Sequence, residues 1–143
     1  MAKHETSVQI NAPVERVFAF MNDPANLPEI WPSYVEVKDV TRLPNGGTSF
    51  RYVYKMAGIR LEGTSEDIEC VPNERTVNKS KGGIEATQVY TFKPEAGGTK
   101  FTWAVEYTVP VPLLGRLAEA IVLKMNEREM NLVMANLKAR MEA

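Results

Sequence analysis

Alternating apolar and polar residues dominate the middle of the chain. The clearest case runs from Phe101 to Val109, where every odd-numbered residue is either aromatic or valine. This period of two is typical of a strand with one buried face. Turn signals rich in glycine and proline divide the region. Between them the pattern predicts strands near residues 34–43, 48–56, 59–71, 74–80, 85–93 and 99–109, and a shorter alternation predicts a first strand over Thr6–Ile10.

Two short helices are predicted between the first strand and this region. Pro13 suits the first position of a helix because its fixed φ is helical. Apolar residues then follow with the spacing of one helical face, namely Val14, Val17, Phe18 and Met21. Asp23 suits a helix cap, and Pro24 opens a second short helix that ends near Pro32. We expect these helices to close one end of the sheet and Trp31 to reach the space beneath them.

A long amphipathic segment, from about Pro112 to Met141, predicts a closing helix. On a helical wheel the apolar residues of its second half point in a direction rotated by roughly 130° from those of its first half. The first set is Leu114, Leu117, Ala118, Ile121 and Met125, and the second set is Met130, Val133, Leu137 and Met141.

Asn126 and Glu129 lie near the bisector of these two directions, together with Val122 and Val133. If one straight helix covers the sheet, Asn126 or Glu129 points into the interior midway along it. If the helix bends or rolls, both side chains stay on its solvated surface. A buried Glu129 would require a donor such as a tyrosine hydroxyl, or its pKa would be raised.

These elements predict a single α+β domain over residues 1–143, in which a curved antiparallel sheet of about seven strands wraps around the C-terminal helix. The aromatic face of the sheet is either plain core or partly the wall of a pocket. Because buried tyrosine hydroxyls need partners, several on one inward face favour a pocket that holds water and ligand. The expected ligand-binding residues are Trp31, Tyr52, Tyr54, Tyr90, Trp103, Tyr107, Ile121, Met125 and Glu129.

Composition narrows the class of protein. The net charge of −1 and the scattered basic residues give no reason to expect a nucleic-acid partner. No apolar run approaches the ~20 residues of a membrane span, and residues 1–9 lack the apolar core of a secretory signal. The single cysteine, Cys70, excludes an internal disulfide and fits a reducing cytoplasm. We therefore expect a cytoplasmic protein without stable membrane insertion.

Residues suited to catalysis are scarce. His4 is the only histidine, so neither a Ser-His-Asp nor a Cys-His arrangement has a well-placed base, and a metal site built from several His or Cys ligands is excluded. The glycine pairs lie in hairpin turns and do not form a phosphate-binding loop before a helix. We expect no metal and no cofactor, and no catalytic residue can be assigned.

Two N-terminal segments carry a family resemblance: NAPVERVF, residues 11–18, and DPANLPEIWP, residues 23–32. Together with the strands and Gly turns that follow, then Val109-Pro110 and a long helix ending in Leu137-Lys138, they resemble the polyketide cyclase/dehydrase and lipid-transport superfamily. This START-like, or Bet v 1-like, group (SRPBCC) has the helix-grip fold. The resemblance implies a hydrophobic ligand cavity between sheet and long helix. No catalytic motif of the family carries over residue by residue.

Three functions remain open. The first is binding or carriage of a small hydrophobic or amphipathic ligand, such as a lipid, a quinone or a polyketide-like molecule. The second is a cyclase or dehydrase that uses the same cavity, with Glu129 or a tyrosine moving protons. The third is a quinone or lipid chaperone associated with a membrane or a partner. This third function depends on the apolar segment from Val109 to Leu114, which is suited to form a lip of the pocket or a patch for contact with a membrane or with a second copy in a homodimer.

Overall fold

The computed structural model describes residues 2–109 and 116–143. Within them the elements follow the predicted order of one strand, short helices, a meander of strands and a long helix. Their bounds are β1 (Ala2–Ile10), α1 (Val14–Met21), the 3-10 helix η1 (Pro24–Asn26), α2 (Leu27–Ile30), β2 (Tyr34–Arg42), β3 (Thr48–Met56), β4 (Ile59–Val71), β5 (Arg75–Gly82), β6 (Ala86–Glu95), β7 (Gly98–Tyr107) and α3 (Arg116–Glu142).

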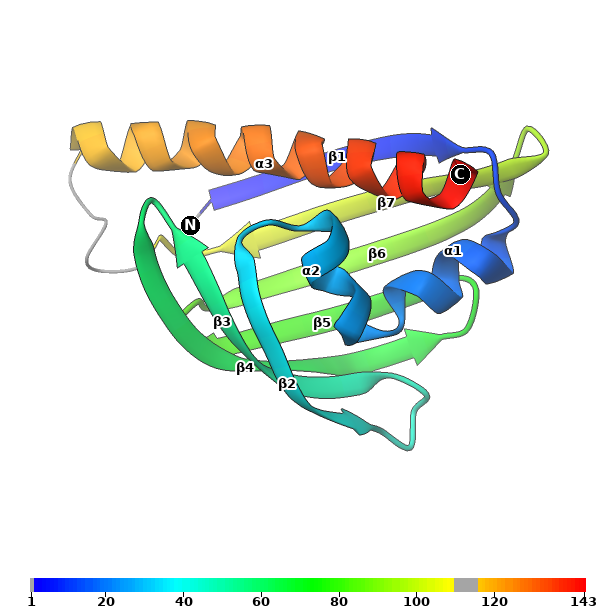
Figure 1. Cartoon of the computed structure of the whole chain (residues 1–143), viewed down its shortest axis with the longest axis horizontal. Coiled ribbons are helices and arrows are strands. Elements are labelled where there is room, and N and C mark those ends of the chain that lie inside the picture. Colours follow the sequence, from blue (N-terminus) through cyan, green and yellow to red (C-terminus); the bar gives the residue numbers. More distant parts are fainter. Residues whose placement is uncertain (1, 110–115) are drawn as a thin grey trace.

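The strands form one antiparallel sheet in the order β1-β7-β6-β5-β4-β3-β2. β2 to β7 follow the chain as a meander, whereas β1 pairs with β7 and so joins the first strand to the last. Figure 1 shows the sheet curving, with α3 running along β1 and β7 and with α1 and α2 on the same side of the sheet. The predicted α+β class, a curved sheet around a long C-terminal helix, is confirmed.

β1 is longer than the alternation of Thr6–Ile10 predicted. It begins at Ala2, which pairs with Tyr107, and the pairing continues without a break to Ile10 opposite Thr99. Half-buried and exposed side chains alternate from Ala2 to Gln9, Ile10 is buried, and Lys3 forms an ion pair with Glu106 on the neighbouring strand. Pairing with β7 therefore extends the strand over residues whose local pattern is weak.

Both short helices start near the predicted residues. Pro13 caps α1 from just outside it, with an extended ψ of 149°, instead of forming its first turn. Asp23 is a cap as expected, because its carboxylate accepts the backbone N–H of Ala25 at 3.1 Å. The second predicted helix divides into η1 and α2 and ends at Ile30, and the predicted start of the long helix, residues 112–115, lies outside the described residues.

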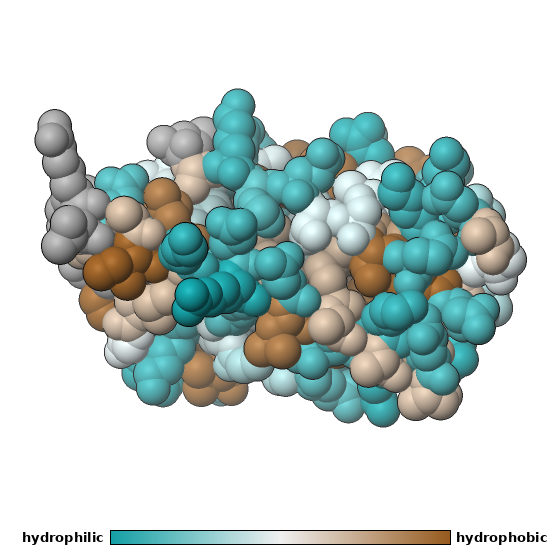
Figure 2. All heavy atoms as spheres, turned by 90° about the horizontal axis from the view of Figure 1, so that it is seen from above, coloured by the Kyte–Doolittle hydropathy of each residue, from teal (hydrophilic) through white to brown (hydrophobic). Residues whose placement is uncertain are grey.

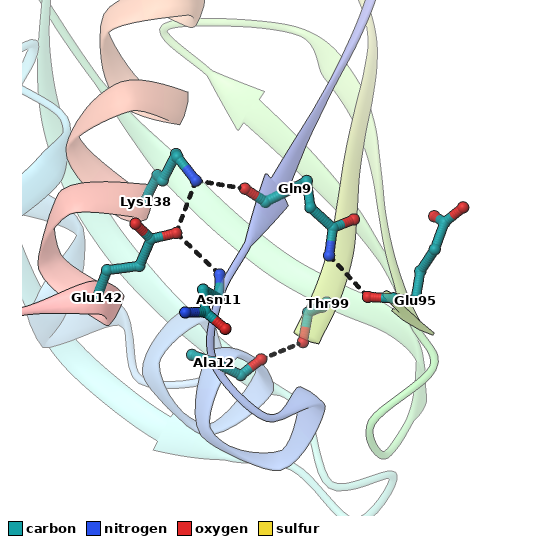
Figure 3. A network of polar contacts seen from close by, with 7 residues as sticks. All are labelled: Gln9, Asn11, Ala12, Glu95, Thr99, Lys138 and Glu142. Carbon is teal, nitrogen blue, oxygen red and sulfur yellow. Dashed lines mark hydrogen bonds and ion pairs between the residues drawn. The ribbon is translucent and has the colours of Figure 1, made fainter. Parts of the chain in front are cut away.

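The C-terminal half of α3 is fastened to the junction between β1 and α1 (Figure 3). The Lys138 ammonium donates to the Gln9 carbonyl at 2.8 Å and to Glu142 at 2.6 Å, and Glu142 accepts the backbone N–H of Asn11 at 2.8 Å. The Thr99 hydroxyl donates to the carbonyl of Ala12 at 2.8 Å in the same network. These contacts hold the end of α3 against the sheet.

Buried apolar residues form two clusters, although one continuous core is usual in a domain. The larger cluster packs α1, α2 and the C-terminal half of α3, including Leu137, against β6 and β7. In the smaller cluster Val122 of α3 packs with residues of the strand ends and of the adjoining loops, namely Met56, Leu61, Ile84, Tyr107 and Val109.

The inner face of the sheet is not aromatic throughout, as the alternation had suggested. Across β4, β5 and β6, in the middle of the sheet, its buried residues include a row of polar side chains: Ser65, Asp67, Thr76, Asn78, Ser80 and Gln88. A buried polar side chain requires a hydrogen-bonding partner or water. The middle of the inner face is therefore chemically different from its aromatic sides.

Candidate functional site

A hollow of about 60 Å³ separates the two clusters and lies between α3 and the inner face of the sheet. Its wall combines aromatic, aliphatic and polar side chains from α3, the α2–β2 turn, the β5–β6 loop and strands β2, β3, β5, β6 and β7. The lining residues are Trp31, Tyr34, Tyr52, Tyr54, Met56, Ser80, Ile84, Ala86, Gln88, Trp103, Val105, Tyr107, Asn126, Glu129 and Met130.

Trp31 is at the centre of the aromatic wall. The residue follows α2, where its backbone N–H closes the last turn onto Leu27 at 2.9 Å. Its ring packs edge-on against Trp103, with centroids 4.5 Å apart, and against Tyr34 at 4.8 Å. The indole N–H donates to the Tyr54 hydroxyl at 3.1 Å. The short helices thus place Trp31 over the hollow, as predicted.

Glu129 reaches the hollow from α3. Its carboxylate accepts the backbone N–H of Ser33 at 3.1 Å and the Ser33 hydroxyl at 2.5 Å. The donor is thus a serine beside β2, not the tyrosine that the sequence suggested. Burial raises the pKa of the nearby Tyr54 hydroxyl well above its usual 10.0, and the negative charge of Glu129 raises it further. Tyr54 is therefore a neutral hydrogen-bonding group beside a carboxylate.

Asn126 lies one turn earlier on the same face of α3. Its amide donates to the Tyr107 hydroxyl at 2.8 Å and approaches the Met56 sulfur at 3.7 Å. Burial raises the pKa of the Tyr107 hydroxyl, and the hydrogen bond from Asn126 partly offsets this. Both polar residues near the bisector of the wheel thus face inward, as expected for one straight helix.

Gln88 occupies the floor of the hollow on β6. Its carbonyl oxygen accepts the indole N–H of Trp103 at 2.8 Å and the hydroxyl of Tyr90 at 3.4 Å. The Tyr52 hydroxyl is bound to the loop after β5, where it accepts the backbone N–H of Ile84 at 3.2 Å. These bonds fix the orientation of the aromatic rings in the wall.

Six of the nine predicted site residues border the hollow: Trp31, Tyr52, Tyr54, Trp103, Tyr107 and Glu129. Tyr90 is buried but borders a second hollow of about 20 Å³ farther along the sheet. Ile121 and Met125 differ from the expectation, because they are 57% and 46% exposed and do not line either hollow. Val122 and Asn126 of α3 face the interior. Ile121 and Met125, each one position earlier, therefore lie on the outer side of the helix.

Nine of the lining residues were not among the predicted site residues. Three of these nine are buried and polar: Tyr34, Ser80 and Gln88. Gln88 occupies an inward position of the alternating pattern around Tyr90, so its place was predictable although its contacts were not. Tyr34 directly follows Pro32-Ser33 and was predicted only as the start of a strand. Ser80 lies in a strand that is polar on both faces, which leaves no sequence signal for its inward direction.

Figure 2, which views the molecule from above, shows hydrophobic residues in separate groups among hydrophilic ones. Ile121, Met125 and Leu132 are exposed on α3. No helix in residues 2–109 and 116–143 is long and apolar enough to cross a membrane, and these residues contain no cluster of three or more potential metal ligands. Val109 is buried in the smaller cluster, and the rest of the predicted lip, residues 110–114, lies outside the described part.

A family model described as polyketide cyclase / dehydrase and lipid transport matches residues 1–142. A search of curated proteins finds no match.

Solved structures resemble the chain over almost its full length. TTHA0849 from Thermus thermophilus is 23% identical with a TM-score of 0.75, and the match covers 98% of this chain and 97% of that one. A START superfamily protein from Mycobacterium smegmatis is 16% identical with a TM-score of 0.80 and the same coverage. The di-domain ARO/CYC StfQ of the steffimycin biosynthetic pathway is 17% identical with a TM-score of 0.75, and the match covers 98% of this chain and 50% of StfQ. At such identities these structures establish the fold.

Proposed function

The chain belongs to the polyketide cyclase/dehydrase and lipid transport family, and from this we propose that it binds a small hydrophobic or amphipathic ligand in the hollow beneath α3. The observation that carries the proposal is the division of the core into two clusters by an aromatic hollow that also contains polar side chains. Binding sites for small molecules commonly combine an apolar wall with a few polar anchors in this way.

A ligand in the hollow would gain free energy in two ways. Its apolar part would be removed from water against the aromatic wall. Its polar groups would replace water at the polar part of the wall.

The hollow must widen to hold a larger molecule, because pockets for drug-sized ligands measure about 300–1,000 Å³. The described contacts favour movement of the part of α3 that precedes Asn126. This part contributes Val122 to the smaller cluster, with Leu123 packed against it. Asn126 and Glu129 are bound to Tyr107 and Ser33, and the C-terminal half is fixed by the larger cluster and by Lys138 and Glu142. We propose that ligand entry displaces the part before Asn126 and leaves the rest of the helix in place.

The six predicted residues that border the hollow would then contact the ligand. Trp31 and Trp103 would supply most of the apolar surface, since aromatic side chains bury large areas. Tyr54, Tyr107 and Glu129 would contact polar groups of the ligand, because each already forms hydrogen bonds at the wall.

Native mass spectrometry of the freshly purified protein, followed by solvent extraction, tests the proposal. We expect a discrete added mass that is lost on denaturation and that identifies the chemical class of the ligand. Ala86 borders the hollow, so Ala86→Leu would fill it and should abolish the added mass. Ala135→Leu, on the exposed side of α3, is the matched control. No added mass, together with no retention of small molecules from a lipid extract, would contradict ligand binding.

A cyclase or dehydrase activity is a second candidate, supported by the carboxylate of Glu129 close to the Tyr54 hydroxyl in the wall of the hollow. Glu129 would accept a proton from an activated carbon of a poly-carbonyl substrate, and neutral Tyr54 would donate a hydrogen bond to a carbonyl oxygen. Glu129→Gln should then abolish formation of a dehydrated aromatic product while the substrate still binds. Unchanged turnover in this variant would exclude the mechanism.

A further inference from the structure

The polar row on the inner face of the sheet has two parts. In the first part the side chains bind one another. Asp67 accepts the backbone N–H of Thr48 at 2.8 Å and the Asn78 amide at 3.0 Å, and the Ser65 hydroxyl bonds to the Asn78 carbonyl oxygen at 2.9 Å. This closed network satisfies its own members and borders the smaller hollow.

The second part consists of Ser80 and Gln88, and together with the neighbouring Tyr34 of β2 these residues have hydrogen-bonding capacity left over. Tyr34, Ser80 and Gln88 are only 6%, 5% and 6% exposed, and all three border the larger hollow. Among the described residues, the hydrogen bonds of the Gln88 side chain all go to its carbonyl oxygen, and the hydroxyls of Tyr34 and Ser80 take part in none. Asn22 Oδ1 is the only fully buried side-chain polar atom of the described residues without a partner, so the three groups are not sealed inside the protein, and a ligand or water in the hollow can bind them.

These three groups come from separate strands that the fold brings together. Ser80 of β5 pairs with Ala86 of β6, two residues before Gln88, so Ser80 and Gln88 are diagonal neighbours on the same face. Tyr34, at the start of β2, borders both hollows, as Gln88 does. The group therefore lies where the larger hollow meets the smaller one.

The chemistry of Gln88 determines what the group can bind. Its carbonyl oxygen is already used by Trp103 and Tyr90, so the amide presents only N–H donors to the hollow. Tyr34 and Ser80 each add a hydroxyl that can donate. Burial holds the pKa of Tyr34 well above 10.0, so this hydroxyl keeps its proton at neutral pH. No Lys, Arg or His is among the described residues that line the hollow, which disfavours an anionic ligand group.

We propose that Gln88, Tyr34 and Ser80 form a subsite for an uncharged oxygen acceptor, such as a ketone carbonyl carried on an apolar ring. The inference rests on the proposed function and adds that the ligand enters carbonyl first, with its apolar body against Trp31 and Trp103. A carbonyl oxygen suits the subsite because it accepts two hydrogen bonds and has no proton that would need an acceptor. A purely hydrocarbon ligand would leave the three donors unpaired, at the cost of a buried unsatisfied group.

Two probes of nearly the same shape test the subsite. In 2-acetylnaphthalene a carbonyl oxygen occupies the position that a methylene group occupies in 2-isopropenylnaphthalene. Binding of each probe is measured by isothermal titration calorimetry. We expect the ketone to bind about tenfold more tightly, which corresponds to the net free energy of about one to two hydrogen bonds.

Variants assign this preference to the three residues. Ser80→Ala and Tyr34→Phe each remove one hydroxyl without adding atoms, and we expect each to reduce the ketone preference by about threefold or more. Ser65→Ala is the matched control, because Ser65 pairs with Ser80 across β4 and β5 but donates to Asn78. This control should leave the preference unchanged. Thermal unfolding shows whether each variant is folded. If Tyr34→Phe does not fold, the comparison of Ser80→Ala with Ser65→Ala is sufficient to test the subsite.

The outcomes distinguish failure of the carbonyl subsite from failure of the hydrophobic ligand site. Equal binding of both probes would overturn the carbonyl subsite and leave the hydrophobic ligand site intact. Binding of neither probe would overturn the subsite and count against the ligand site as well. An undiminished ketone preference in Ser80→Ala and Tyr34→Phe, or an equal loss in Ser65→Ala, would show that these donors do not make the subsite.

Discussion

Glu129 of α3 is joined to Ser33, 96 residues earlier in the chain, through the Ser33 backbone N–H and the Ser33 hydroxyl. Ser33 is itself fixed to the sheet, because its carbonyl accepts the backbone N–H of Lys55 at 2.8 Å. One carboxylate therefore connects the middle of α3 to the α2–β2 turn and, through it, to β3. This connection lies in the wall of the hollow, so the stability of α3 and the shape of the site depend on the same residues.

Removal of the Glu129 carboxylate should destabilise the protein. In Glu129→Ala the N–H and the hydroxyl of Ser33 lose their acceptor in a partly buried position, and we expect a loss of about 1–3 kcal/mol in the free energy of unfolding. Ser33→Ala keeps the backbone bond and should cost about 1 kcal/mol. Urea denaturation provides both values.

Glu127→Ala is the control for this prediction. It changes an exposed position two residues earlier, and its free energy of unfolding should stay within about 0.5 kcal/mol of the parent protein. Equal effects of Glu127→Ala and Glu129→Ala would show that the Ser33 contact does not stabilise α3.

Asn126 and Tyr107 should be energetically coupled. Their hydrogen bond, 2.8 Å long, connects α3 to the end of β7 at the other side of the hollow. A double-mutant cycle with Asn126→Ala and Tyr107→Phe should give a coupling free energy of about 0.5–1.5 kcal/mol by urea denaturation. Purely additive single-variant effects would mean that the two side chains do not stabilise each other.

The alternation of apolar and polar residues predicted the sheet well because six of its strands follow one another as a meander. Strand ends in that region shifted by only a few residues between pattern and structure. The N-terminal half of β1 was missed, since Lys3 and Glu5 owe their extended conformation to pairing with Glu106 and Ala104. Such pairing joins residues about a hundred positions apart and leaves no local signal in the sequence.

The site was harder to predict than the fold, for two physical reasons. The helical wheel predicted that Ile121 and Met125 face inward because they are apolar. In the structure both are exposed. α3 instead presents Asn126 and Glu129 to the hollow, where they hydrogen-bond to Tyr107 and Ser33. On β5 the inward residue Ser80 and its outward neighbour Lys79 are both polar. Alternation reveals the inward face of a strand only where one face is apolar and the other polar, and β5 is polar on both faces.

Gly63 should not tolerate a side chain. On β4 it lies opposite Tyr52 of β3 and Gly82 of β5, and a Cβ atom there would collide with the Lys81 carbonyl oxygen and the Tyr52 hydroxyl. Gly63→Ala should therefore destabilise the protein by about 1–3 kcal/mol and displace the Tyr52 ring that lines the hollow. Thermal unfolding measures the loss of stability, and probe binding by calorimetry measures the displacement of Tyr52.

Gly97→Ala is the control for the loss of a glycine. A Cβ atom at Gly97 would meet no atom within 4 Å, so this variant carries only the backbone strain of a positive φ, which is 78°. A full-stability Gly63→Ala variant would contradict this packing of Tyr52 over β4.

Alkaline pH should unfold the protein through its buried tyrosines. The pKa values of Tyr34, Tyr52, Tyr54, Tyr90 and Tyr107 are all raised above 10.0 in the folded chain, and burial is the largest cause in each case. The unfolded chain loses these phenolic protons near pH 10, whereas the folded chain retains them, so the stability they contribute is complete below pH 10 and falls as the pH rises toward the folded-state values. We therefore expect tyrosinate absorbance and loss of circular dichroism to appear together above pH 10 as one cooperative transition. Burial raises the pKa of Tyr34 and Tyr90 strongly, whereas the hydrogen bond from Asn126 partly offsets the raised pKa of Tyr107, so Tyr34→Phe and Tyr90→Phe should delay alkaline unfolding more than Tyr107→Phe does. Tyrosinate formation near pH 10 in a chain that keeps its native circular dichroism would show that the rings bordering the two hollows are open to solvent, and would count against an enclosed site beneath α3.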